Sequence, residues 1–300
     1  MTEIRGRAAV VTGGGSGIGK GMALALVEQG ASVAIADIIY ENAQAVAAEI
    51  NAAGGKAFPV HVDVCERDSI RKMKAEAEAA LGPISLVLAN AGATNFDTLH
   101  EIRDSEADWI IQVNLMGVLQ TLQAFLPDMI ARGEGGHVVG TASIAGFLPT
   151  TVPIHTVYAA AKMGIVGLMM NLSCELEEHR IGSTVYPPGG VIGNMKAGNE
   201  RYRPARFGGL GTGEVFVPAA SFANHKVGKN DLLPIEAGRM VCRGIRNNRL
   251  IVVDHSYQRQ LWEEDYASHV RQAYDDIAEY EREHGAPEKV LWDTTGAESR

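Results

Sequence analysis

Short apolar runs alternate with longer stretches of helical spacing along most of the chain. The apolar runs are continuous, as expected of strands that are buried on both faces of a sheet. They predict strands at Ala8–Val11, Ser32–Ala36, Ala57–Val62, Leu86–Ala89, Gly136–Thr141, Ser183–Tyr186 and Leu250–Val253. The stretches between them predict helices at Ile18–Glu28, Glu41–Ala53, Arg67–Leu81, Ser105–Arg132 (one helix or two), Val157–His179 and Tyr257–Glu283. This alternation predicts an α/β fold in which a doubly wound parallel sheet carries helices on both faces.

One segment departs from this alternation. Residues 194–233 contain several glycines, scattered basic and aromatic side chains and no sustained periodicity. A long irregular segment in a compact domain is usually a binding loop or a lid. We therefore expect a single domain over residues 1–300, with a substrate-binding lid at about 194–233 and a C-terminal helical extension at about 257–283.

A glycine-rich loop joins the first predicted strand to the first predicted helix. Its sequence is Thr12-Gly13-Gly14-Gly15-Ser16-Gly17-Ile18-Gly19. Such glycines allow a tight turn and bring backbone N–H groups close to a pyrophosphate, which the start of the following helix also attracts. Asp37 ends the second predicted strand, 18 residues beyond Gly19, close to the spacing of an acid that binds ribose. The alternatives are a plain strand–helix turn and an acid that only caps a helix or loop.

Asp37 also distinguishes between the two nicotinamide dinucleotides. A carboxylate accepts hydrogen bonds from both ribose hydroxyls of NAD, and it repels the 2′-phosphate of NADP. Ile38 and Ile39 follow Asp37, and Ser16 lies in the glycine loop, so these positions offer no cation for a phosphate. The sequence therefore predicts NAD as the cofactor.

Three further residues have the chemistry of proton transfer. Tyr158 and Lys162 are four residues apart in a predicted helix, which places both on one helix face. Ser143 follows the predicted strand Gly136–Thr141, and ligands of open α/β sheets bind where strands end. A nearby ammonium and the positive charge of nicotinamide would lower the pKa of a tyrosine below its usual value. Tyr158 could then exchange a proton with an alcohol or carbonyl oxygen that Ser143 holds.

In this order, the motifs resemble those of short-chain dehydrogenases/reductases with a TGxxxGIG loop. The matching segments are Thr12–Gly19, Asp63-Val64, Asn90-Ala91-Gly92, Asn114, Ser143, Tyr158-Ala159-Ala160-Ala161-Lys162 and Pro188-Gly189. The resemblance implies a Rossmann fold and an NAD-dependent alcohol dehydrogenase or ketone reductase, with Asn114, Ser143, Tyr158 and Lys162 as catalytic residues. The cofactor contacts that we expect are Gly13, Ser16, Gly17, Ile18, Gly19, Asp37, Asp63, Val64, Asn90, Ala91, Gly92, Tyr158, Lys162, Pro188, Gly189 and Val191.

The resemblance also implies separate tasks for these residues. Asp63 and Val64 would contact adenine, and Asn90–Gly92 would line the adenosine side. Asn114 would hold a water that links Lys162 to solvent, although it could be an ordinary helix residue, as Asp63 could be a turn cap. Lys162 would bind the nicotinamide ribose as well, and Pro188, Gly189 and Val191 would border the nicotinamide.

The chain departs from the family pattern at several positions. Gly193 stands where relatives commonly have a threonine that bonds the carboxamide, so Asn194 or backbone would have to supply that contact. The gap from Ser143 to Tyr158 is long and contains two prolines, which predicts an enlarged loop over the substrate. His155 could touch substrate, or it could simply begin the helix.

The segment 194–233 should form the family's substrate-binding lid. Its Met195, Tyr202, Phe207, Phe216 and Phe222 would suit a bulky hydrophobic or aromatic secondary alcohol. Its Arg201, Arg203 and Arg206 could bind a carboxylate or be solvated surface charges. The part of the chain from Pro234 onward is similar to family members that oxidise benzylic alcohols of lignin-derived aryl ethers.

Composition and charge exclude other classes. Lys plus Arg number 27 against 36 Asp plus Glu, and this net charge of -9 disfavours nucleic acid as a partner. Cys65, Cys174 and Cys242 form no CxxC pair, so we expect neither a metal site nor a disulfide. The chain shows no secretory signal and no apolar run of about 18 residues, so we expect no membrane span and a cytoplasmic location.

Partners and competing functions complete the expectations. The resemblance suggests a homodimer or homotetramer that uses the helices near Ser105–Arg132 and Val157–His179. An NAD-dependent epimerase or dehydratase is one alternative. Its glycine loop usually has two residues between the first glycines of the motif, whereas Gly13 and Gly17 here enclose three. A catalytically silent NAD-binding sensor or scaffold is the other alternative, and it would be expected to lack Tyr158, Lys162 or Ser143.

Overall fold

The computed structural model describes residues 1–193, 195, 203–209 and 231–286. In this part of the chain six parallel strands form one sheet in the order β3-β2-β1-β4-β5-β6. The strands are β1 (Ala8–Thr12), β2 (Ser32–Asp37), β3 (Ala57–His61), β4 (Ile84–Ala89), β5 (Gly136–Thr141) and β6 (Ile181–Tyr186). This order is that of a Rossmann fold, and it confirms the predicted doubly wound parallel sheet.

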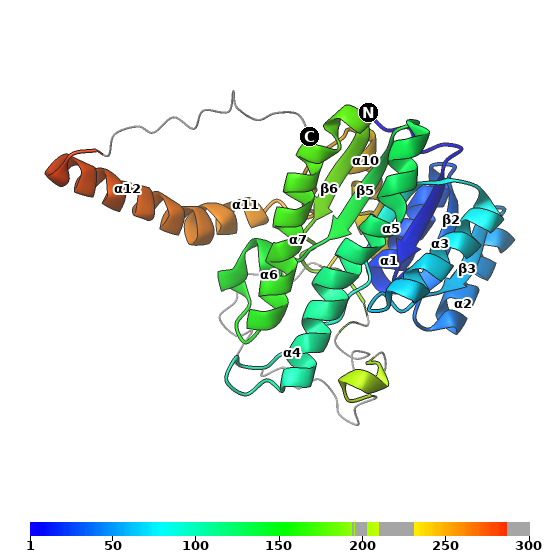
Figure 1. The fold of residues 1–300 in the computed structure, drawn as a ribbon, viewed down its shortest axis with the longest axis horizontal. Helices are drawn as coiled ribbons and strands as arrows, with labels where there is room; N and C mark the ends of the chain where they lie inside the picture. The colour runs from blue at the N-terminus through cyan, green and yellow to red at the C-terminus, as the bar shows by residue number, and fades with distance from the viewer. Residues whose placement is uncertain (194, 196–202, 210–230, 287–300) are drawn as a thin grey trace.

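Helices cover both faces of the sheet (Figure 1). The core on one face is formed with α1 (Gly17–Glu28), α2 (Tyr40–Ala52) and α10 (Pro234–Arg246). The core on the other face is formed with α3 (Arg67–Leu81), α4 (Asp104–Ile111), α5 (Gly117–Arg132) and α7 (Thr156–Glu175). All of these strands except the edge strand β3 are almost fully buried, which explains their continuous apolar sequences.

The sequence pattern was not used to predict a helix at α10. This helix packs very closely against α1. A Cβ atom on Gly21 would lie 1.9 Å from the carbonyl oxygen of Pro234, and a Cβ on Gly238 would lie 2.2 Å from that of Gly21. Glycine at both positions therefore lets the two backbones touch. The helix starts at Pro234, and the Glu236 carboxylate accepts a hydrogen bond from the Leu233 N–H at 3.0 Å.

The predicted strand Leu250–Val253 is wrong as a strand. Ile251 makes a single parallel bridge to Val185, held by Val185 N–H to Leu250 O at 2.8 Å and Val252 N–H to Val185 O at 3.0 Å. The pairing stops there because Val253 turns outward and is exposed, while Asp254 turns inward and bonds the loop after β6. An apolar run alone cannot reveal such a change of direction.

The predicted helix Ser105–Arg132 is continuous but irregular. A π-helical turn, Gln112–Met116, joins α4 to α5. The enlarged loop between Ser143 and Tyr158 is filled by α6 (Ile144–Phe147) and a 3-10 turn, Pro149–Thr151. The C-terminal extension is α11 (Gln258–Leu261), a second π-helical turn (Trp262–Tyr266) and α12 (Ala267–His284), which projects from the body (Figure 1).

Two helical stretches, Asp104–Arg132 and Thr156–Glu175, are long and apolar enough to cross a membrane by length and composition alone. About half of the apolar window is buried in each, 50% and 44% respectively. Both stretches contribute side chains to the core on one face of the sheet. Core helices commonly meet the same length and composition criterion.

The glycine loop supplies a test of the fold. A Cβ on Gly19 would lie 2.1 Å from the carbonyl oxygen of Gly13, so Gly19→Ala must displace backbone at the start of α1. We expect this change to lower the free energy of unfolding by about 1–3 kcal/mol in urea denaturation. Gly167→Ala is the control, because nothing lies within 4 Å of its Cβ position and it stands inside α7. The control should raise stability by about 0.5–1 kcal/mol, and equal effects of the two changes would contradict the backbone contact.

Candidate active site

A cavity of about 870 Å³ lies at the carboxyl ends of the strands. Its wall is made by the loops that follow the strands and by the first turns of α7. The predicted residues that line it are Gly13, Ser16, Gly17, Ile18, Gly19, Asp37, Asp63, Val64, Asn90, Ala91, Gly92, Ser143, Tyr158, Lys162, Pro188, Gly189 and Val191. The fold therefore brings positions from the whole matched sequence to one cavity, with Asn114 buried beside it.

Asn90 joins the ends of three strands beneath this cavity. Thr12 Oγ1 accepts hydrogen bonds from the backbone N–H groups of Asn90 at 3.0 Å and Ala91 at 3.1 Å. The Asn90 side chain donates to Thr12 O at 3.1 Å and accepts from Thr141 Oγ1 at 3.1 Å. These bonds hold the loops after β1, β4 and β5 in register with one another.

The glycine loop and Asp37 are connected directly. Gly13 and Gly17 have positive φ angles of 64° and 47°, which favour glycine. The Gly15 N–H donates to Asp37 Oδ2 at 2.9 Å, and the Ile39 N–H donates to Asp37 Oδ1 at 2.9 Å. Burial raises the pKa of Asp37, while these backbone bonds oppose the rise. The carboxylate keeps further acceptor capacity, since each oxygen can accept two hydrogen bonds.

Tyr158 and Lys162 lie on successive turns of α7, as their spacing predicts. Lys162 Nζ donates to the Thr141 carbonyl at 2.9 Å and lies 5.6 Å from the centre of the Tyr158 ring. Ser143 caps α6 by accepting from the Ala145 N–H at 3.1 Å, and it also hydrogen-bonds Tyr158. The three polar side chains therefore meet at the cavity wall.

The electrostatics of this group differ from the sequence expectation. Burial raises the pKa of Tyr158 to about 12, and the hydrogen bond with Ser143 opposes this rise. Burial also lowers the pKa of Lys162 to about 7. In the protein alone, loss of solvation thus outweighs the lowering of the tyrosine pKa that a neighbouring ammonium was expected to produce.

Asn114 occupies the π-helical turn between α4 and α5. Its Nδ2 donates to the carbonyls of Ala93 and Ile110, both at 2.9 Å, and its Oδ1 accepts from the Ala93 N–H at 3.3 Å. A Cβ on Gly92 would lie 2.7 Å from Asn114 Oδ1 and 3.2 Å from Lys162 Nζ. Asn114 and Lys162 therefore approach each other across a glycine, as a proton relay between them would need.

Much of the remaining cavity wall is aromatic or apolar, although Asn42, Thr94 and Asp231 also line it. His155 lines it, with Nε2 3.1 Å from Thr94 Oγ1 and its ring centre 4.3 Å from Phe96 and 4.6 Å from Tyr158. His155 thus begins α7 and also faces the cavity. Further wall residues are Trp109, Val113, Val152 and Met195. Sequence reasoning missed Phe96 and Trp109, since neither residue belongs to a motif.

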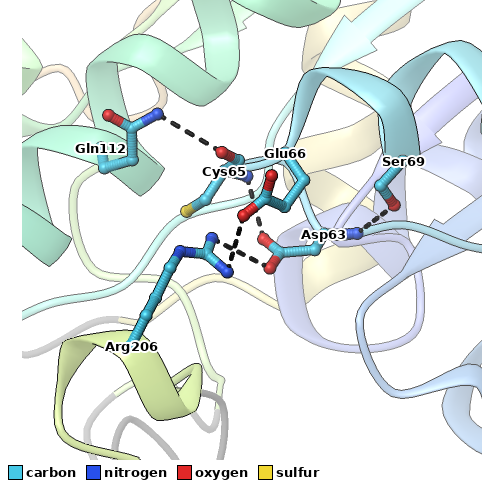
Figure 2. Close-up of polar contacts among 6 residues, drawn as sticks. All are labelled: Asp63, Cys65, Glu66, Ser69, Gln112 and Arg206. Atoms are coloured by element: carbon cyan, nitrogen blue, oxygen red, sulfur yellow. Dashed lines mark hydrogen bonds and ion pairs between the residues drawn. The ribbon is translucent and has the colours of Figure 1, made fainter.

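The arginines of the predicted lid are paired with acids of the chain itself. Arg203 is buried, with its guanidinium 3.0 Å from Glu106 and stacked 4.8 Å from the centre of the Trp109 ring. Arg206 pairs with Asp63 and Glu66 (Figure 2). The solvated interpretation is wrong for Arg203, which is buried, whereas Arg206 is exposed at the surface. Binding of a substrate carboxylate by either side chain stays a prediction. Arg201, Tyr202, Phe216 and Phe222 lie outside the described residues.

The nicotinamide side of the predicted site is less fully defined. Gly193 lines the cavity opposite Gly17, and a Cβ on Gly193 would lie 3.8 Å from Gly17 Cα. Asn194, the predicted substitute for the missing threonine, lies outside the described residues. The carboxamide contact therefore stays a prediction.

Asp254 holds the loop after β6, and sequence reasoning gave it no role. Its side chain is fully buried and accepts from the Gly189 N–H at 2.9 and 3.1 Å, from Tyr186 OH at 2.8 Å and from Gln258 Nε2 at 2.9 Å. His255 Nδ1 is 2.7 Å from the same carboxylate. Several donors converging on one acid fix Pro188-Gly189 against the cavity. Asp254 and Gly189 are far apart in sequence, so no local pattern could pair them.

This network gives a second test. Asp254→Asn places an amide donor among groups that need an acceptor, so we expect a loss of about 2–4 kcal/mol in the free energy of unfolding. Urea denaturation of the ligand-free protein measures it. Asp276→Asn, on the exposed surface of α12, should change the value by less than about 0.5 kcal/mol. A loss at Asp254 no larger than at Asp276 would show that the buried bonds contribute little.

Comparison with known proteins agrees with this geometry. The family model of short chain dehydrogenases matches residues 7–203. The chain is 30% identical, over 97% of its length and 93% of the relative's, to a C alpha-dehydrogenase of Sphingobium sp. strain SYK-6. It is 33% identical, over 60% of its length and 69% of the relative's, to a (-)-trans-carveol dehydrogenase of Rhodococcus erythropolis. A short chain dehydrogenase/reductase of Burkholderia phymatum, solved in complex with NAD, has a TM-score of 0.78 and 25% identity, with 97% of this chain and 100% of that chain covered. This chain belongs to the short-chain dehydrogenase/reductase family.

Proposed function

We propose that this protein is an NAD-dependent oxidoreductase that interconverts a bulky hydrophobic or aromatic secondary alcohol and its ketone. One observation carries the proposal: a single cavity holds the glycine loop with Asp37 and, beyond it, Ser143, Tyr158 and Lys162. Bound NAD would accept or supply the hydride at its nicotinamide ring. The proposal includes a cytoplasmic homodimer or homotetramer, which the half-buried apolar helices α5 and α7 would suit.

The residues at one end of the cavity fit a dinucleotide without a 2′-phosphate. Residues of the glycine loop line the cavity at the start of α1, where an anion is favoured. Asp37 has acceptor capacity for ribose hydroxyls, and its charge would repel a phosphate at close range. The relative from Burkholderia phymatum that was solved with NAD supports the same cofactor.

The proton would be handled by Tyr158. Its phenol can donate to a ketone oxygen during reduction, and its phenolate can accept the hydroxyl proton during alcohol oxidation. Ser143, already bonded to Tyr158, would hold the same substrate oxygen. Lys162 would stabilise the phenolate when charged, and Asn114 would pass protons from Lys162 toward solvent through water.

The substrate class follows from the remaining wall. Phe96, Trp109 and His155 contribute aromatic side chains to the wall, and Val113 and Val152 contribute apolar ones. Flat aromatic groups pack well against such walls. The similarity to a C alpha-dehydrogenase over nearly the whole chain favours a benzylic alcohol, and the similarity to a carveol dehydrogenase keeps alicyclic alcohols in the test.

Turnover measured by absorbance of reduced nicotinamide tests this function. The panel contains aryl, alicyclic, steroid and sugar alcohols and acyl thioesters, each with NAD and with NADP. We expect oxidation of aryl carbinols with NAD, at least about tenfold less efficient oxidation with NADP, and a loss in Tyr158→Phe of about 100-fold or more in kcat. NADH binding by the variant should be unchanged.

Other results would favour the competing functions. NADH binding without turnover of any panel member would support a silent sensor or scaffold. Turnover that persists in Tyr158→Phe would remove the tyrosine mechanism, and conversion of a sugar nucleotide without net oxidation would support an epimerase or dehydratase.

The pH dependence has a defined sign. Burial raises the pKa of Tyr158 to about 12, so the free enzyme holds the phenol form at neutral pH. Oxidation needs the phenolate, so its kcat/KM should rise from pH 7 to 10, by up to about tenfold per pH unit. Reduction needs the phenol, so its kcat/KM should not rise over the same range. An oxidation profile that falls above pH 7 would contradict this assignment.

A further inference from the structure

Arg206 links two parts of the chain that are 143 residues apart. It stands on a short 3-10 turn, Ala205–Phe207, and reaches the loop between β3 and α3 (Figure 2). One guanidinium nitrogen is 3.2 Å from Asp63 Oδ2, and another is 2.9 Å from Glu66 Oε1. The guanidinium also lies 4.8 Å from the centre of the Phe207 ring. One side chain therefore bridges two carboxylates, as the planar fork of arginine allows.

The bridge fixes the orientation of Asp63. Its Oδ1 accepts from the Cys65 N–H at 2.9 Å, its Oδ2 accepts from Arg206, and its own N–H donates to Ser69 Oγ at 2.9 Å (Figure 2). Each carboxylate oxygen can accept a second hydrogen bond. Asp63 lines the cavity, so it presents an oriented acceptor to whatever lies at that end.

The bridge also changes the local charge. Asp63 in the cavity wall and Glu66 three residues along carry two negative charges, and Arg206 reduces their sum to one. A dinucleotide brings its own negative phosphates into the same cavity. Without Arg206, these phosphates would meet more repulsion, although solvent and salt screen part of it because Arg206 is half-exposed.

We propose that Arg206 is a positioning residue for the adenosine half of the cofactor. It holds Asp63 in the orientation that accepts a hydrogen bond from the exocyclic amine of adenine, and it offsets the charge of Asp63 and Glu66. This inference rests on the proposed function. The segment 203–209 belongs to the part of the chain expected to cover the substrate. Through Arg206 it would contribute to cofactor binding at the opposite end of the cavity.

Titration calorimetry with the two halves of NAD tests the proposal on the full chain. Arg206→Ala should bind ADP-ribose about threefold to tenfold more weakly than the unaltered protein. Its affinity for nicotinamide mononucleotide should not change. In turnover assays the KM for NAD should rise by the same factor, while kcat at saturating NAD stays the same. The difference in ADP-ribose affinity should shrink at high salt.

Two variants separate positioning from simple anchoring of the segment. Glu106→Gln weakens the attachment of the same segment at Arg203, 3.0 Å from Glu106, without touching Asp63. It should leave ADP-ribose affinity unchanged. Arg206→Lys keeps the charge but cannot bridge both carboxylates, so it should restore part of the affinity.

The outcomes are distinct. Equal or tighter binding of ADP-ribose by Arg206→Ala would overturn the proposal, and so would an equal loss in Glu106→Gln. If the unaltered protein binds neither ADP-ribose nor NADH, the proposed function itself fails and this inference fails with it. If the unaltered protein binds both and only the Arg206 effect is missing, the proposed function stands without this role.

Discussion

The site depends on the hydrogen bonds that Asn90 makes at the carboxyl edge of the sheet. After β1 the chain continues to β2 on one side of the sheet, and after β4 it continues to β5 on the other side. The loops that follow β1 and β4 therefore diverge, and a cavity can open between them. Asn90 ties Thr12, the last residue of β1, to Thr141, the last residue of β5, across this opening. The glycine loop and the segment that leads to Ser143 are thereby fixed relative to each other.

Burial sets the chemistry of the cavity wall. Tyr158 and Lys162 are both enclosed, and enclosure disfavours the charged form of each, so the tyrosine pKa rises to about 12 and the lysine pKa falls to about 7. With these values the ligand-free protein keeps Tyr158 as the neutral phenol at neutral pH, while Lys162 exchanges between its ammonium and amine forms. A positive charge entering the cavity would favour phenolate, so the protonation state of the pair would respond to what is bound. Ser143 favours the same direction through its hydrogen bond.

Local pattern was sufficient for six strands, the glycine loop and the spacing of Tyr158 and Lys162, because each is encoded within a few adjacent residues. It failed where the outcome depends on distant contacts. The apolar run Leu250–Val253 makes one bridge, to Val185, before Asp254 bonds the Gly189 N–H. Helix α10 was missed although its start carries local signals at Pro234 and Glu236, and only its close packing on Gly21, more than 200 residues earlier, needed the structure. Phe96 and Trp109 became wall residues only when α4 and the loop after β4 were placed over the sheet. Sequence shows a cation near Tyr158 but not the loss of solvent around both groups, which raises the tyrosine pKa in the ligand-free protein.

The C-terminal part of the chain gives the site its rigidity from outside the matched family segment, which ends at residue 203. Asp254 fixes the Gly189 backbone, and Leu261 packs with Ile144 and Leu148, so α11 supports the short helix that Ser143 caps. The positions of Ser143 and of Pro188-Gly189 in the cavity wall thus depend on Asp254 and Leu261, which do not line the cavity themselves. The Ile144 N–H also donates to Pro188 O at 2.9 Å, so α6 and the loop after β6 are bonded directly to each other. Ser143 and the Pro188 loop are therefore held by contacts that continue through α6 to the C-terminal extension.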